Sequence, residues 1–264
     1  MSLTGKTKAG SYKDILQVDN SNSGITTAIK NIKDGEGTAS CAWLSDDSLL
    51  LRPVNDDSTP LQVRDKDGNP LFTVNAADDS VKAGIGQHTV NTHIQNFSLS
   101  WGNSLPSTAD TWTAIYANAH PTLAEIAVTA GTGSDPATTL TVDGSTILAS
   151  SVVNVYWHVP FNITLDSCTV IYGADANDGD SVKFSLMSYT IDKANGSTSG
   201  DLSAGVELCA SGAISGSGDE QVYYDTLIVA NDDVDAGKCI VAFINSDGTD
   251  SDYSVNMQLV YHLR

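Results

Sequence analysis

The sequence predicts an all-β protein, in which an extended N-terminal segment and an intertwined stem of strands precede a head built as an antiparallel, jelly-roll-like β-sandwich. Only four of the 32 acidic residues are Glu. The others are Asp, which bonds to nearby backbone in turns, whereas Glu favours helix interiors. The chain also contains 22 Gly, and strand-length apolar runs separated by turn sequences recur through its second half. Helix is therefore expected to be scarce.

Composition argues against several classes of partner. The chain has 264 residues, of which 41% are hydrophobic and 17% charged, enough for a buried core. Its net charge is −19 and its Arg residues form no basic cluster, so binding to nucleic acid or to an anionic membrane surface is not expected. No apolar run approaches the length of a membrane span, and no secretion signal is visible. We expect a chain that is made in a cytoplasm and stays soluble, without membrane insertion.

Residues 1–50 are polar and show weak periodicity. Short apolar strands are expected at 15–18 and 49–52, and turns at 20–24 and 33–37. Three isoleucines have helical spacing, but the Thr and Gly residues near them argue against a long helix. This part of the chain is therefore expected to be mostly extended.

The next segment holds three strand-length pieces, at 60–64, 70–75 and 80–85, separated by Asp-Gly-Asn and Ala-Ala-Asp-Asp. Each piece carries only two or three apolar side chains, too few for three strands to fold alone. We therefore expect three copies of the chain to wrap together here as a homotrimer. The side chains expected to line the shared interior are those of Leu61, Val63, Phe72, Val74, Val81 and Ile85.

One or two further strands are expected between residue 86 and the end of the stem near residue 103. Strand signals are strong from residue 109 onward, and apolar side chains alternate in runs such as 182–186 and 255–261. The runs at 125–130, 138–142 and 152–161 also indicate strands. Regularly spaced strands of this kind predict an antiparallel sandwich or jelly roll. No repeat of 20–50 residues is visible, which argues against a solenoid.

The histidines do not indicate a metal site. His88 and His93 are five residues apart, which on one strand places them on opposite faces. His120 and His158 are isolated in the sequence, and no G-x-S-x-G motif frames a serine. We therefore predict no catalytic residue, no metal site and no cofactor.

The four cysteines, Cys41, Cys168, Cys209 and Cys239, show no metal-ligand spacing. The last three lie inside apolar runs, where a free cysteine acts as a small buried hydrophobic residue. They are expected to be reduced and buried. A bridge between Cys168 and Cys239 is the alternative.

Acidic and aromatic residues have structural interpretations. Residues 175–180 resemble a calcium loop in composition but lack its ligand spacing and its closing Glu. Adjacent acids, such as those at 46–47 and 232–233, are expected in solvated turns, since glycosidase carboxylates must face each other across a cleft. The four Trp are expected as core or interface anchors, with sugar stacking by an exposed Trp as the alternative.

Several motifs resemble structural proteins of tailed bacteriophages, especially marine ones. The first are the pieces at 5–7, 12–24, 33–38 and 44–47, which read GKT, YKDILQVDNSNSG, KDGEGT and LSDD. The segment VNDDSTPLQVRDKDGNPLFTVNAADDSVKAG is similar to the strand repeat of trimeric phage fibres and spikes. GADANDGDSVKFSLMSYTID and DYSVNMQLVYHL are similar to the β-sandwich head of such proteins.

This resemblance implies a non-enzymatic virion component, a homotrimeric fibre or spike or a capsid decoration protein. Residues 1–50 would anchor it to other capsid or tail proteins, 51–103 would form the trimeric stem, and 104–264 the outward head. Binding of the head to a glycan or protein on the host surface is a further expectation. The alternatives are a tailspike depolymerase that acts on polysaccharide and a carbohydrate-binding module.

Overall fold

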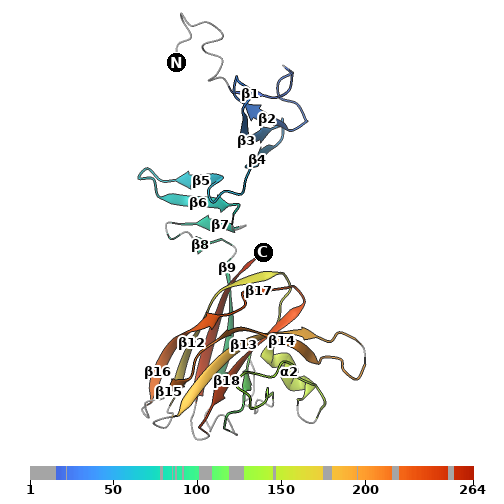
Figure 1. The fold of residues 1–264 in the computed structure, drawn as a ribbon, viewed down its shortest axis with the longest axis vertical. Helices are drawn as coiled ribbons and strands as arrows, with labels where there is room; N and C mark the ends of the chain where they lie inside the picture. Colours follow the sequence, from blue (N-terminus) through green and yellow to red (C-terminus); the bar gives the residue numbers. More distant parts are fainter. Residues whose placement is uncertain are drawn as a thin grey trace, which may run out of the picture. The chain divides into compact units, whose positions relative to one another are not determined.

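The chain divides into two compact units, Met1–Val90 and Asn91–Arg264, which we call the N-terminal unit and the C-terminal unit. The computed structural model (Figure 1) describes residues 16–21, 23–77, 80–84, 86, 88–90, 92–100, 109–118, 128–144, 147–174, 180–194, 196–215, 220–248 and 253–264. Nearly all the regular structure in these ranges is strand, so the prediction of an all-β fold is confirmed.

The N-terminal unit contains two four-stranded antiparallel sheets, each a meander in which strands adjacent in sequence pair. The first sheet consists of β1 (Gln17–Val18), β2 (Lys30–Lys33), β3 (Ala39–Leu44) and β4 (Leu49–Leu51). The second consists of β5 (Leu61–Arg64), β6 (Pro70–Asn75), β7 (Ser80–Ala83) and β8 (His88–Thr89). The three strand-length pieces predicted between residues 60 and 85 thus form β5, β6 and β7.

The C-terminal unit is a jelly roll. Eight strands lie on its main path: β9 (Thr92–Ser100), β10 (Thr113–Ile115), β12 (Ile163–Ala174), β13 (Ser181–Ile191), β14 (Leu202–Ala210), β16 (Gln221–Val229), β18 (Lys238–Ser246) and β19 (Tyr253–Leu263). Counted one to eight along the chain, the first pairs with the eighth, the second with the seventh, the third with the sixth and the fourth with the fifth. This is the connectivity of a long hairpin rolled into two layers.

The two layers have the strand orders β9-β19-β12-β16 and β10-β18-β13-β14, joined by a short pairing between β14 and β16. Three short strands flank them: β11 (Tyr156–His158) pairs with β18, β15 (Ile214–Ser215) with β13, and β17 (Asp233–Val234) with β12. Tyr172 of β12 contacts Phe184 of β13 with ring centroids 5.1 Å apart, although two strands separate them in the sheet order. The contact therefore crosses the interior between the layers.

Alternation of apolar residues explains the burial in β12, where side chains are buried at nearly every second position. In β13 and β18 side chains of both parities are buried. The segment around residues 137–140 covers part of this second face, since Tyr189 donates a hydrogen bond to the carbonyl of Ala137 and Gly205 N–H donates to the carbonyl of Thr138. A Cβ on Gly205 would lie 2.8 Å from the Cα of Thr138, so only glycine permits this approach.

The expectation of a strand at 152–161 is wrong in its first half. Residues Ala149–Val155 form the short helix α2, and only Tyr156–His158 pair, as β11 with β18. The three-residue spacing of Val152 and Val155 lets a helix bury both, which outweighs the β propensity of the valines.

Two other runs expected as strands contribute only single bridges. Leu140 forms an isolated bridge with Leu202, and Thr129 one with Thr113. Residues 125–127 of the first run lie outside the described residues. A further difference concerns residues 92–100, placed in the stem by the sequence, because β9 pairs along its whole length with β19 of the C-terminal unit.

Candidate assembly surface

In the single chain, the described part of the N-terminal unit has no apolar core. Among its described residues every buried side chain is polar, and the first buried apolar side chain in chain order is that of Phe97 in the C-terminal unit. The buried polar residues are Asn31, Ser45, Thr73, Asn75 and Ser80. Soluble domains normally bury the opposite kind of residue. In the described part of this unit, the apolar side chains are therefore not buried by other residues of the same chain.

Most apolar side chains of the second sheet lie on one face, whereas Leu71 of β6 points to the other. The register places Leu61 opposite Val74 and Val63 opposite Phe72, while Val74 also lies opposite Val81. Residues paired across antiparallel strands point to the same side of a sheet. Leu61 is 36% exposed and Val63 is 50% exposed. The face is thus apolar and open to solvent.

The opposite face of this sheet is mostly polar. Gln62 and Lys82 lie on either side of Thr73 in the register, and the Gln62 Nε2 donates to Thr73 Oγ1 at 2.9 Å. Thr73 is only 4% exposed. Thr73 on this face is thus covered, although Leu71 on the same face is exposed. Leu61 and Val63 of the apolar face are open to solvent, as expected of an element whose partner is another molecule.

Five of the six residues predicted to line a shared interior occupy this one face: Leu61, Val63, Phe72, Val74 and Val81. The sixth, Ile85, lies outside the described residues. We call the face the stem face. The structure holds one chain, so contact between copies at the stem face stays a prediction.

The C-terminal unit has a smaller apolar surface on the outer side of its β16 and β12 strands. Tyr224 is 68% exposed and lies directly opposite Ile171, which is also exposed. Val222 and Ile228 share the parity of Tyr224 on β16 and are exposed as well. An exposed row of this kind, with Thr226 between Tyr224 and Ile228, is a candidate contact surface.

No tryptophan among the described residues is exposed enough to offer a face for sugar stacking. Trp112 is buried, Trp43 and Trp157 are half-buried, and Trp101 lies outside the described residues. Trp157 packs against Tyr261 with ring centroids 5.0 Å apart, and His93 stacks on the same tyrosine at 5.5 Å.

Histidines and acids are not gathered into a metal centre in the ranges that the structure describes. His88 and His93 belong to different strands, β8 and β9, rather than to one. His120 and most of the acidic loop 175–180 lie outside the described residues. In the same ranges no helix has the length and apolar character needed to cross a bilayer.

One pair of acids does interact in the C-terminal unit. Burial raises the pKa of Glu207, and the negative charge of Asp135 raises it further. The Ser185 hydroxyl donates to Glu207 at 3.5 Å, which acts in the opposite direction. Glu207 lies on β14 and Asp135 in the loop between the bridges at 129 and 140.

All four cysteines are free, and Cys168, Cys209 and Cys239 are buried as predicted. A hydrogen bond with the Cys168 thiol and burial both raise the pKa of Cys209. Burial raises the pKa of Cys239 to about 12. Cys168 thus contacts Cys209, rather than forming the alternative bridge with Cys239.

Thiol reactivity should follow this burial. We expect one thiol per chain, that of exposed Cys41, to react with Ellman's reagent in the native protein, because buried thiols with raised pKa supply little thiolate. All four should react after denaturation without reductant. Fewer than four would contradict the reduced state of the core.

Comparison with known proteins identifies no family. No family description matches the sequence, and no curated protein matches it. A solved structure titled "Structure of infectious bursal disease virus Gx strain" aligns with 89% of this chain and 44% of its own, at 9% identity and a TM-score of 0.28. The chain thus spans less than half of that protein's length, and these values are too low to assign a family or a fold.

Proposed function

We propose that this protein is a non-enzymatic structural component of a bacteriophage particle, a homotrimer held together through the N-terminal unit. The observation that carries the proposal is the absence of any buried apolar side chain in the described part of that unit. A segment with this much strand and no core of its own gains stability when other copies cover its apolar face. Three copies, rather than two, are expected from the resemblance to phage fibres and spikes.

The C-terminal unit has the opposite character, with a complete apolar core within one chain. In the proposed arrangement it folds without a partner and presents a surface. In the same arrangement residues 1–50 dock on capsid or tail proteins and the jelly roll faces outward. The exposed row around Tyr224 is the surface that we assign to contact with a glycan or protein of the host.

Purified particles of the virus that encodes the chain should contain it. Quantitative mass spectrometry of such particles gives its copy number: a few trimers per particle support a tail fibre or spike, and many copies support a capsid decoration. Absence of the chain from intact particles would overturn the proposal.

The rival function is hydrolysis of host polysaccharide by a tailspike depolymerase, and the observation in its favour is the raised pKa of Glu207. Shortening of host surface polysaccharide by the purified protein, lost in Glu207→Gln, would support the enzyme. Unchanged polysaccharide length would support the structural role.

A further inference from the structure

The first sheet of the N-terminal unit contains a turn of defined geometry between β2 and β3. Asp34 N–H donates to the carbonyl of Thr38 at 3.1 Å, and Gly37 N–H donates back to the carbonyl of Asp34 at 3.1 Å. The Asp34 carboxylate accepts from the N–H groups of Glu36 and Thr38, and these bonds lower its pKa. Gly37 has a φ of 89°, which favours glycine.

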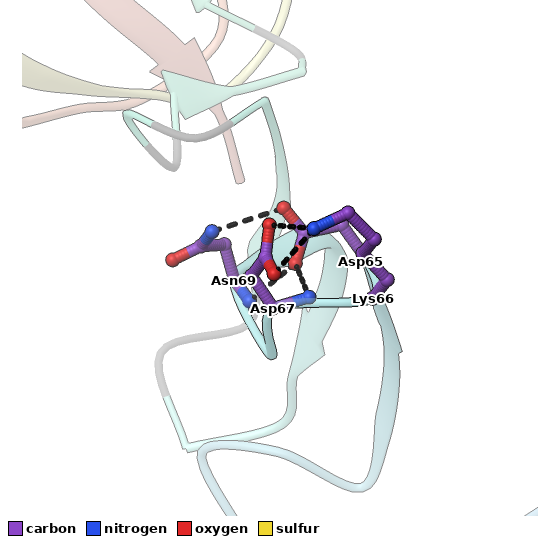
Figure 2. Close-up of polar contacts among 4 residues, drawn as sticks. All are labelled: Asp65, Lys66, Asp67 and Asn69. Atoms are coloured by element: carbon purple, nitrogen blue, oxygen red, sulfur yellow. Dashed lines mark hydrogen bonds and ion pairs between the residues drawn. The ribbon is translucent and has the colours of Figure 1, made fainter.

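The second sheet repeats this turn between β5 and β6 (Figure 2). Asp65 N–H donates to the carbonyl of Asn69 at 2.9 Å, and Gly68 N–H donates to the carbonyl of Asp65 at 3.1 Å. The Asp65 carboxylate accepts from the N–H groups of Asp67 and Asn69, and bonds from the Asn69 side chain and backbone lower its pKa most. Gly68 has a φ of 86°. The donors, acceptors and glycine position match those of the first turn.

The strands that follow the two turns also match. A bulge lies beside the turn in each sheet, between β2 and β3 and between β5 and β6. Next along the chain, Leu44 pairs with Leu49 across β3 and β4, as Val74 pairs with Val81 across β6 and β7. Two residues further from the connection between these strands, Ala42 pairs with Leu51 in the first sheet and Phe72 pairs with Ala83 in the second.

Two features of the sequence agree with this repeat. The turn acids are 31 positions apart, and the sequences Ser-Asp-Asp-Ser at 45–48 and Ala-Asp-Asp-Ser at 77–80 follow β3 and β6. The sequence shows no visible repeat of 20–50 residues, and the structure adds one pair of similar hairpins rather than a solenoid. The repeat escapes detection because the spacing between its two turns differs by one residue and its strands share almost no identities.

We propose that the first sheet is a second copy of the same associating module, and that it packs against the first sheets of other copies of this chain. The proposal rests on the proposed function and extends it, since that function gives residues 1–50 only an anchoring role. The face used carries Leu44, Leu49 and Leu51, which correspond to Val74, Val81 and Ala83 of the stem face.

Exposure supports this choice of face. Leu49 is 64% exposed, although it belongs to a strand of three consecutive leucines. Lys30 pairs with Leu44 where Leu61 pairs with Val74, so the first sheet has a lysine at the edge of its apolar face. A lysine at such an edge lays its aliphatic stem along the apolar surface and keeps its charge in water. The occupant that fits is the equivalent face of another copy, as for the stem face.

Cross-linking tests the proposal in the full-length chain. Leu49→Cys and Val81→Cys occupy equivalent positions in the two sheets, and Val54→Cys, at a position 88% exposed in the segment between β4 and β5, is the control. Each is made in a Cys41→Ser background, because Cys41 is an exposed native thiol. Oxygen with copper–phenanthroline accepts the two electrons and two protons released by each disulfide.

We expect both Leu49→Cys and Val81→Cys to convert monomer bands to dimer bands on a non-reducing denaturing gel, and Val54→Cys to stay monomeric. Cross-linking of Val81→Cys alone would overturn the further inference and leave the proposed function standing. Failure of both variants would overturn the two together. Equal cross-linking of Val54→Cys would also overturn the inference, because contact would then not depend on the face.

Discussion

The native protein should have a solution mass of three times the 27.7 kDa of one chain, and Val74→Asp should reduce it to one chain. Val74 lies in the central strand β6, between Leu61 and Val81 in the register. Covering an apolar side chain of this size contributes about 1.5–3 kcal/mol. An aspartate there removes that contribution in every copy and brings three carboxylates into an apolar contact, where an unpaired charge is strongly disfavoured. Light scattering coupled to size-exclusion chromatography measures the mass.

Leu71→Asp is the matched control for this change. Leu71 precedes Phe72 on the same strand and therefore points to the opposite side of the sheet, where it is exposed. The same chemical change at this position should leave the mass at three chains. A native chain that is already monomeric, with its strands intact, would contradict the assembly and remove the reason for the proposed function.

The sequence was sufficient for the fold class because its signals are local. Alternation at Val182, Phe184 and Leu186 defines one face of β13, and all three side chains are buried. Turn sequences rich in Asp and Gly separate the strands at nearly every expected place. The pairing of the strands, however, depends on contacts between residues far apart in the chain. The sequence pattern therefore favoured a sandwich or jelly roll, and only the pairings of β9 with β19 and β10 with β18 identify the jelly roll.

The missed elements have physical causes. A run such as 152–161 satisfies strand propensity, but a strand also needs a neighbour with free hydrogen-bonding groups, and β18 pairs only with Tyr156–His158 there. Residues 92–100 follow the stem segment without a change in composition, so nothing local places β9 in the C-terminal unit. Boundaries of this kind are decided by tertiary pairing.

The candidate site could be predicted in part for a similar reason. Period-two spacing and short hairpins predict that Leu61, Val63 and Phe72 share a face, and the register agrees. The sequence does not reveal that Thr73 on the polar face is buried, because the Gln62 side chain that bonds to it comes from the neighbouring strand. The equivalence of the two sheets depends on hydrogen bonds around Asp34 and Asp65, which two short and dissimilar sequences produce alike.

The second large effect is expected in the core of the jelly roll. Phe184→Ala should lower the free energy of unfolding of the C-terminal unit by about 3–5 kcal/mol, the usual cost of truncating a buried phenylalanine. Phe184 is fully buried on β13 and contacts Tyr172 of β12 across the interior, so its removal leaves a cavity between the two layers. For a unit of this size the melting temperature should fall by about 6–20 °C, which calorimetry measures.

The same variant tests whether the two units carry separate tasks. Because the apolar core lies in the C-terminal unit and the stem face in the N-terminal unit, Phe184→Ala should lower the melting temperature while the mass below that temperature stays at three chains. Tyr224→Ala removes an aromatic ring of similar size from an exposed position on β16 and should change the melting temperature little. Dissociation of the Phe184→Ala protein into folded monomers would show instead that the jelly roll holds the copies together.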